Sequence, residues 1–295
     1  MGLGLSGHRR AGLKGLPTLP EVAIRILKLV DDPRTTVKDV VRAIESDASL
    51  VAQLLKLVNS PLYGFRSQIT SVERAILLVG FYSVRNLALG ISVLNAFRGR
   101  MSRELKGLWR HSIEVGCVAK VLCEAFPLPL TAVELSSSDV FTWGLLHDVG
   151  RIALCYLHGD GYVGSVLSGE ELDLTEGMEK ERSLYGTDHA ELGATLLEEW
   201  ALPAHASRVV RAHHLEPAPG VDVLSALHLY LYLGEGLSHC ARGVRSPEEL
   251  EDRLKLVPCR EISIGKLGLF SDPGLLFSSL SRGFSEAEGL LSVWG

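Results

Sequence analysis

The chain has 295 residues, of which 46% are hydrophobic and 22% charged, so it can bury a sizeable core as one large domain or two moderate ones. Its formal net charge of −5 argues against non-specific nucleic-acid binding as the main role. There is no apolar run of about 18 residues, no signal-peptide core and no C-x-x-C pair among the cysteines, which predicts a cytoplasmic protein with free thiols and no membrane partner.

The first hundred residues show apolar positions at helical spacing and no strand-like alternation. Residues 1–15 are rich in glycine and basic residues, and they predict a flexible arm with little core to bury. Capping residues and helix breakers predict helices that begin near Leu19, Thr36, Asp47, Val72 and Ser83, with Thr70 and Glu73 forming a capping box for the helix over 72–79.

A charged stretch near residue 100 suggests a boundary between two helical subdomains, 16–100 and 101–295. The second subdomain is expected to contain a long helix that carries His111, a helix capped at Ser136 that leads to His147, and a strongly apolar helix over 224–237. Asp188 should cap a helix with His189 in its first turn, and Pro203 should open one that ends at His213-His214. The whole pattern predicts an all-α fold.

His147 and Asp148 lie side by side at the end of an apolar run, in the stretch WGLLHDVGR. Burying a histidine and an aspartate is costly unless both are paired, and a divalent metal satisfies both at once. Imidazole nitrogen and carboxylate oxygen suit Zn, Fe, Mn or Ni. A buried ion pair is the alternative interpretation, because a lone His-Asp pair occurs often by chance.

Several longer motifs resemble the HDOD family, the HD-related output domain of bacterial signalling proteins. They are "LPTLPEVAIRIL", "DASLVAQLLKLVNSPLYG" and "ITSVERAILLVGFYSVRNLAL" in the first half, and "GLLHDVG", "DHAELGATLLEEWALP" and "AHH" in the second. The order of the histidines resembles that of the wider HD superfamily of metal-dependent phosphohydrolases. The resemblance covers roughly residues 16–240 and implies an N-terminal helical bundle packed on an HD-like helical bundle.

The resemblance also implies a metal site, whose ligands in this chain would be His111, His147, Asp148, His189, His213 and His214. Each has an ordinary alternative: His111 could be a core histidine bonded to a carbonyl, and His189 could lie exposed at a helix terminus. His213 and His214 point about 100° apart on a helix, so both reach metals only at a binuclear centre or a loosened helix end. Arg151 replaces the lysine of the HD motif and could bind a phosphate oxygen or be a surface cation.

HD enzymes usually supply a further aspartate from a later helix, and the position that we align with it is Leu231. Glu235, one turn further along, or His228, roughly one turn back, could replace it. With Leu231 in that place, a phosphodiester would be held but hardly turned over, because the site lacks a carboxylate near the water. We therefore expect no catalytic residues and a site that binds an anion.

The favoured function is a signalling module that acts through a protein partner or a bound nucleotide, with a partial HD-type metal site. The alternative is a metal-dependent phosphohydrolase or phosphodiesterase acting on nucleotides or cyclic dinucleotides, although the G-Y-P loop of one such group is missing after His214. A nucleic-acid-binding regulator is a third hypothesis, because residues 71–92 resemble a helix–turn–helix. Only Arg74, Arg85 and Asn86 could form its recognition face, which argues against a nucleic-acid partner.

Overall fold

The computed structural model describes residues 14–30, 34–98, 103–128, 135–167, 174–217, 220, 222–255 and 271–294. Within these ranges every regular element is a helix, which confirms the all-α prediction. Most of the arm predicted over 1–15 lies outside the described residues. No helix in the described ranges is long and apolar enough to cross a membrane.

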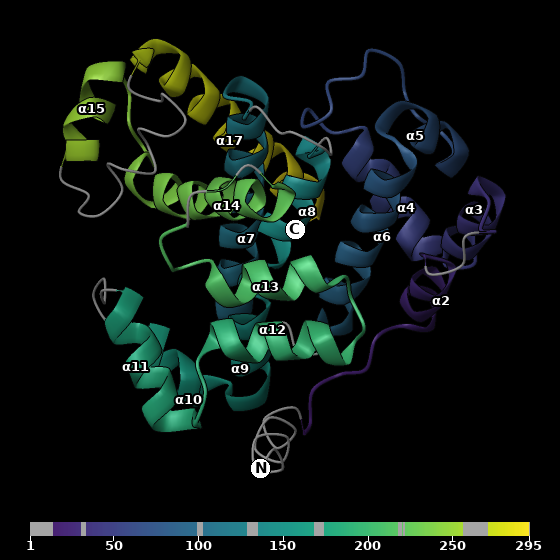
Figure 1. Ribbon diagram of the computed structural model, residues 1–295, viewed down its shortest axis with the longest axis horizontal. Helices are drawn as coiled ribbons and strands as arrows, with labels where there is room; N and C mark the ends of the chain where they lie inside the picture. Colours follow the sequence, from purple (N-terminus) through teal and green to yellow (C-terminus); the bar gives the residue numbers. More distant parts are fainter. Residues whose placement is uncertain are drawn as a thin grey trace.

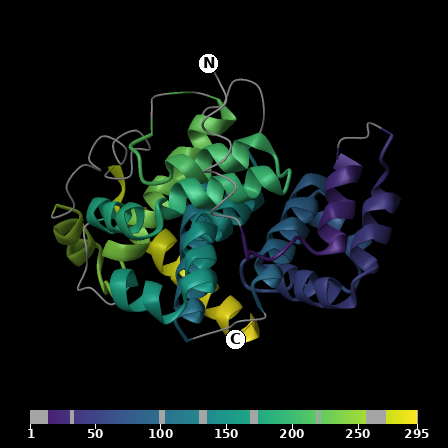
Figure 2. The same cartoon turned by 90° about the horizontal axis from the view of Figure 1, so that it is seen from below.

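Among the described residues, the N-terminal half is a bundle of five helices around aliphatic side chains (Figure 2). Its caps are local: the Asp47 carboxylate accepts a hydrogen bond from the Leu50 amide, and the Ser71 hydroxyl accepts one from the Arg74 amide. The cap of α5 was thus wrongly placed at Thr70, one residue too early. The helices are α2 (Glu21–Val30), α3 (Val37–Glu45), α4 (Ala48–Val58), α5 (Val72–Val79) and α6 (Phe81–Ala96).

The C-terminal half is built around the long helix α7, which packs against α8, α14 and α17 (Figure 1). Helix α6 of the N-terminal bundle packs on α8 and so joins the two halves. The remaining elements are α7 (Arg103–Ala125), α8 (Ser137–Leu146), α9 (Val149–His158), α10 (Asp160–Tyr162), the π-helix η2 (Val163–Leu167), α11 (Leu174–Tyr185), α12 (His189–Glu199), α13 (Ala204–Ala212), α14 (Val223–Cys240), α15 (Pro247–Lys255) and α17 (Pro273–Trp294).

Glycines let these helices approach each other at backbone distance. A Cβ added to Gly150 of α9 would lie 1.8 Å from the carbonyl oxygen of His189 at the start of α12. A Cβ added to Gly144 of α8 would lie 2.7 Å from the Cα of Gly116 on α7. Only residues without a side chain fit such crossings. The helices that carry the candidate ligands therefore pack with their backbones in close approach.

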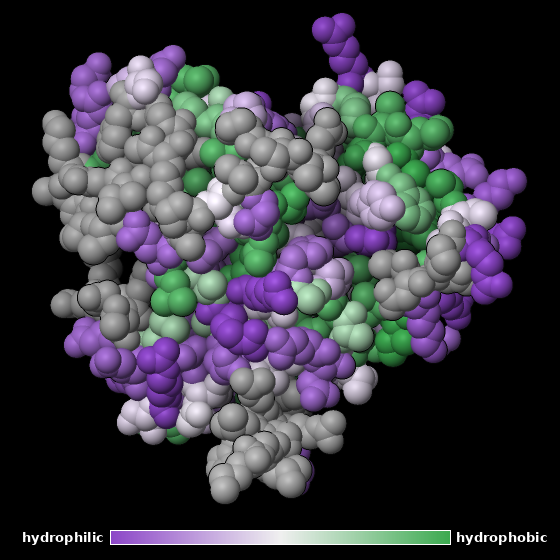
Figure 3. Space-filling view, viewed as in Figure 1, coloured by the Kyte–Doolittle hydropathy of each residue, from purple (hydrophilic) through white to green (hydrophobic). Residues whose placement is uncertain are grey.

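Apolar side chains also reach the surface, mainly on the N-terminal bundle. Leu77 of α5 is 83% exposed, and Leu78 and Tyr82 beside it are exposed as well. A hydrophobic area is visible over α5 at the upper right of Figure 3. Arg85 and Asn86 of the suspected helix–turn–helix are instead buried, and Asn86 donates a hydrogen bond to Asp139 of α8. Those two side chains are thus not free to read a nucleic acid.

Candidate metal centre

His147 and Asp148 lie at the joint between two helices. His147 ends α8 and Asp148 begins α9, where its backbone leaves helical geometry at φ −100° and ψ 20°. The joint turns both side chains into the interior, and each is only 1% exposed. The two carboxylate oxygens of Asp148 face different sets of histidines, which defines two donor groups that share this residue.

The first donor group comprises His111 of α7, His147, Asp148 and Glu235 of α14. The Nε2 atoms of His111 and His147 each lie 3.7 Å from the Oδ2 atom of Asp148. The Oε2 atom of Glu235 lies 3.0 Å from His111 Nε2 and 3.2 Å from His147 Nε2. Two imidazoles and two carboxylates thus converge, a donor set that suits a divalent transition metal.

The second donor group comprises Asp148, His189 of α12, and the adjacent His213 and His214. The Nε2 atoms of His189 and His213 each lie 3.6 Å from the Oδ1 atom of Asp148. His214 reaches the same group, with its Nε2 atom 2.8 Å from that of His189. Both adjacent histidines can contribute because α13 ends at Ala212, so they lie beyond its last helical turn.

Hydrogen bonds outside the centre orient the imidazole rings. The Nδ1 atoms of His147 and His213 lie 2.6 Å from the carbonyl oxygens of Gly144 and Val210, as expected if each Nδ1–H donates to its carbonyl. The lone pair of Nε2 is then directed into the centre. These Nε2 atoms, and both carboxylate oxygens of Asp148, are buried and make no hydrogen bond in the described structure. Because such burial is costly, the donor set fits bound cations.

Glu181 of α11 supports His189 from behind. Its Oε2 atom accepts a hydrogen bond from the backbone amide of His189 at 2.8 Å and lies 2.7 Å from the ring Nδ1. Its other oxygen accepts a hydrogen bond from the Tyr162 hydroxyl at 2.7 Å. This carboxylate fixes the tautomer that aims Nε2 at the second donor group. Sequence reasoning missed Glu181, because nothing in the weakly periodic stretch before Asp188 points to it.

The electrostatics of the centre keep its carboxylates ionised. Burial opposes ionisation of Asp148, but Arg151 and the histidines outweigh it and hold its pKa well below the usual range. Glu235 is likewise buried, and His111 and His147 hold its pKa well below the usual range. Burial would lower the pKa of His147, yet the two carboxylates raise it. Burial and the neighbouring imidazoles lower the pKa of His214 well below its ordinary value.

The described structure corrects the alignment that placed Leu231 where a ligand was expected. Leu231 is 1% exposed and belongs to the hydrophobic core, where its Cδ2 atom faces Gly144. Glu235, one helical turn further along α14, supplies the carboxylate instead. His228 lies outside both groups, and its Nε2 atom is 2.7 Å from the Ala212 carbonyl oxygen. The premise that α14 supplies no carboxylate to the centre is therefore wrong.

Two further side chains border the centre. Arg151 of α9 is mostly buried, with its Nε atom 3.3 Å from the Oδ1 atom of Asp148. Burial lowers the pKa of Arg151, but Asp148 more than compensates and raises it, so the guanidinium stays charged. His239, which the sequence did not single out, follows Glu235 by one turn, and its ring centroid is 5.1 Å from that of His111.

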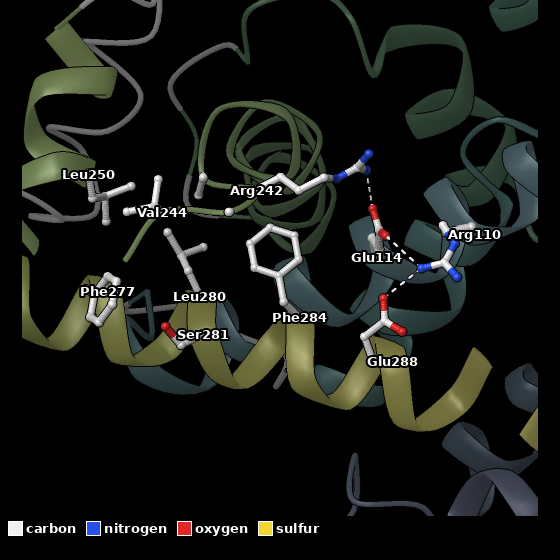
Figure 4. Close-up of a pocket in the computed structure, with 12 residues that line it drawn as sticks. Arg110, Glu114, Arg242, Val244, Leu250, Phe277, Leu280, Ser281, Phe284 and Glu288 are labelled. Carbon is white, nitrogen blue, oxygen red and sulfur yellow. Dashed lines mark hydrogen bonds and ion pairs between the residues drawn. The ribbon is translucent and has the colours of Figure 1, made fainter. Parts of the chain in front are cut away.

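A cavity of about 320 Å³ lies between α7, the end of α14 and α17 (Figure 4). Its mouth holds an ion-pair network in which Glu114 contacts both Arg110 and Arg242, and Glu288 accepts a hydrogen bond from Arg110. The rest of the wall is mostly apolar and includes two leucines, two phenylalanines and Val244. None of the donor residues lines this cavity, so it is separate from the centre.

An all-helical fold in which buried histidines surround an aspartate at the joint of two helices is that of the HD class of protein. Within that class, the chain belongs to the HDOD family, whose domain model matches residues 16–216. An uncharacterized protein from Treponema pallidum is 26% identical over 202 residues, which are 68% of this chain but only 38% of that relative. The chain thus spans well under half of that relative's length.

Two solved structures share the fold over nearly the whole chain. An HDOD domain protein of unknown function from Geobacter sulfurreducens superposes with a TM-score of 0.70 at 24% identity, covering 97% of this chain and 95% of that one. A provisionally named phosphohydrolase from Shewanella amazonensis superposes with a TM-score of 0.69 at 21% identity, covering 97% and 99%. At these identities the likeness establishes the fold alone.

Proposed function

We propose that this HDOD protein holds two divalent cations in the centre and hydrolyses a phosphate ester of the nucleotide class as part of signalling. The observation that carries the proposal is the position of Asp148: its Oδ2 atom faces His111 and His147, and its Oδ1 atom faces His189 and His213. A carboxylate so divided is suited to bridging two cations. Two-metal phosphatases place their ions about 3.5–4 Å apart, a distance that one carboxylate spans.

The residues of the chain have separable roles in this proposal. Cations bound in both groups would supply Lewis-acid activation of a phosphate ester. The nitrogen and oxygen donors favour Fe, Mn, Zn or Ni over softer metals. The guanidinium of Arg151 is charged and lies beside Asp148, so it would position a phosphate oxygen bound at the centre. Glu235 adds the second negative charge that a centre with Leu231 in its place would lack.

The signalling part of the proposal is supported by relatives and by the surface. The chain belongs to the HDOD family, and another solved structure with the fold, from Marinobacter aquaeolei, is provisionally named a signal transduction protein. Exposed Leu77, Leu78 and Tyr82 on the N-terminal bundle favour a contact with a protein partner there. This surface belongs to α5 and α6, whereas the donor residues come from α7 to α14.

The test is to load the purified protein with Mn or Fe and assay cyclic dinucleotides, nucleotides and generic phosphodiesters. We expect multiple turnovers that fall by at least about 100-fold in His147→Ala and Asp148→Ala, because each variant removes a donor of the centre. His158→Ala, which changes an exposed histidine stacked on Tyr185, is the matched control and should keep full activity. A metal-loaded protein that turns over none of these substrates would contradict the proposal and favour a purely ligand-holding signalling module.

A further inference from the structure

Glu235 presents its second carboxylate oxygen away from the two donor groups. Its Oε2 atom faces the Nε2 atoms of His111 and His147, and is buried without a hydrogen bond in the described structure. Its Oε1 atom lies 3.4 Å from the Nε2 atom of His239. The side chain of Glu235 is 3% exposed while that of His239 is 58% exposed, so this pair connects the centre with the solvent.

The spacing of the pair is that of two ligands for one ion. Glu235 and His239 are four residues apart on α14 and therefore lie on one face of the helix. Pairs at this spacing on a helix can bind one metal together, as the two histidines of zinc proteases do. Donor atoms of His111, Glu235 and His239 all lie within 4.8 Å of one another. The arrangement therefore has the dimensions of a cation site.

We propose that Glu235 Oε1 and His239 Nε2 form a third, exchangeable cation site on the solvent side of the centre. The proposal rests on the two-cation function above, because Glu235 would join the new site to the first donor group. His111 already faces Glu235 Oε2 from within that group, so the protein offers the third cation only two full ligands. Water or a phosphate oxygen must complete its coordination.

Two consequences follow from the small number of protein ligands. The third cation binds roughly tenfold or more weakly than the two inner ones, because two protein ligands replace the four donors of each inner group. Inorganic phosphate or a phosphorylated substrate tightens it, because an anionic oxygen supplies a missing ligand and offsets charge. The occupied site thus recognises the phosphate of the substrate from the side that faces solvent.

The experiment is a Mn²⁺ titration of the metal-free full chain, followed by the electron paramagnetic resonance signal of free Mn²⁺, with and without inorganic phosphate. We expect two tight equivalents and one weaker equivalent that phosphate tightens. His239→Ala should lose the weak equivalent and keep the two tight ones. His158→Ala, a change at another exposed histidine, should keep all three.

The outcomes separate the two proposals. Two tight equivalents with no third one, or a third one that survives in His239→Ala or is indifferent to phosphate, overturn the outer site and leave the two-cation centre standing. In that case His239 and Glu235 form only an ion pair. Fewer than two tight equivalents in the wild-type chain would overturn the two-cation centre, and the outer site with it.

Discussion

Glu181 determines which nitrogen of His189 is available to the centre. In Glu181→Gln the side chain loses the negative charge that strengthens its hydrogen bonds with the ring and the backbone amide of His189. We expect metal affinity at the second donor group to fall by about 10–100-fold, the usual effect of losing such a support. Isothermal titration with Mn²⁺ or Zn²⁺ measures it.

Glu179→Gln is the control for this change, since Glu179 is an exposed acid on the same helix α11. It should bind metal like the wild type. If Glu181→Gln also binds metal with unchanged affinity, the Glu181–His189 pair is only structural.

Leu231, in contrast to Glu181, contributes to the hydrophobic core and not to the metal centre. Leu231→Asp would place a carboxylate in the core, because Leu231 is 1% exposed and is surrounded by hydrophobic side chains. We expect the free energy of unfolding to fall by about 3–5 kcal/mol, the cost of an uncompensated buried charge. Urea unfolding of the metal-free protein measures the loss. Leu77→Asp, at an exposed position, should change the same quantity by about 0.5 kcal/mol or less.

The crossing of α9 and α12 is the element on which the second donor group depends. Gly150→Ala would place its methyl group within 1.8 Å of the His189 carbonyl oxygen, so the two helices must separate. We expect a loss of stability of several kcal/mol, as for other overpacked core positions, together with weaker metal binding through His189. Thermal unfolding and metal titration of the same samples check both effects.

Gly177→Ala of α11 is the matched substitution, because an added Cβ there meets nothing within 4 Å. It should stabilise the protein by about 0.5–1 kcal/mol through helix propensity alone. Equal effects at the two glycines would show that the close crossing has no energetic consequence.

Helix α17 contains a buried acid, Glu286, whose ionisation destabilises the folded state. Burial raises the pKa of Glu286 to about 7, although Lys120 and Arg282 pull it down. The folded protein therefore holds a proton that the unfolded chain releases near pH 4.5, and stability from this group declines as pH rises from about 4.5 to 7. We expect the free energy of unfolding of Glu286→Gln to exceed that of the wild type by roughly 1–3 kcal/mol at pH 8 and to equal it at pH 5. Urea unfolding at the two pH values measures the difference.

Glu288→Gln provides the comparison on the same helix, since Glu288 is exposed and pairs with Arg110. Its effect on the unfolding midpoint should be similar at both pH values. A Glu286→Gln effect that is the same at pH 5 and pH 8 would contradict a raised pKa for Glu286.

Local elements were predictable from sequence where their signals are local. The caps at Asp47, Ser136 and Asp188 were found as predicted, because each contacts an amide only two or three residues away. At α5, Thr70 and Ser71 are both of a residue type that caps helices, and the sequence did not show that Ser71 is the cap. The resemblance supplied the six expected donors. The choice of Glu235 over Leu231 required the rotation of α14 against α7, which no local signal encodes.

For the whole molecule, bound cations should stabilise the folded state. The donors come from α7, the α8–α9 joint, α12, the end of α13 and α14, and they meet only when the chain is folded. A ligand that binds only the folded state adds about 2.7 kcal/mol at a concentration of one hundred times its Kd. For a chain of this size we expect Mn²⁺ to raise Tm by several degrees and a chelator to reverse it.

Scanning fluorimetry measures this shift directly. The Tm of Asp148→Ala should respond far less to Mn²⁺, because both donor groups lose their shared carboxylate. His158→Ala should respond like the wild type. A wild-type Tm that is indifferent to every divalent cation would argue that the centre binds none.

The glycines at the helix crossings and the metal ligands are different residues, so the fold and the metal centre can change independently in evolution. Gly144 and Gly150 determine how closely the helices pack, whichever residues occupy positions 147 and 148. A descendant gene could therefore exchange a ligand by a single codon change and still encode the same bundle, whereas a changed glycine would cost the fold. Mutation can thus remove the metal ligands from such a protein while the exposed apolar side chains of the N-terminal bundle stay in place.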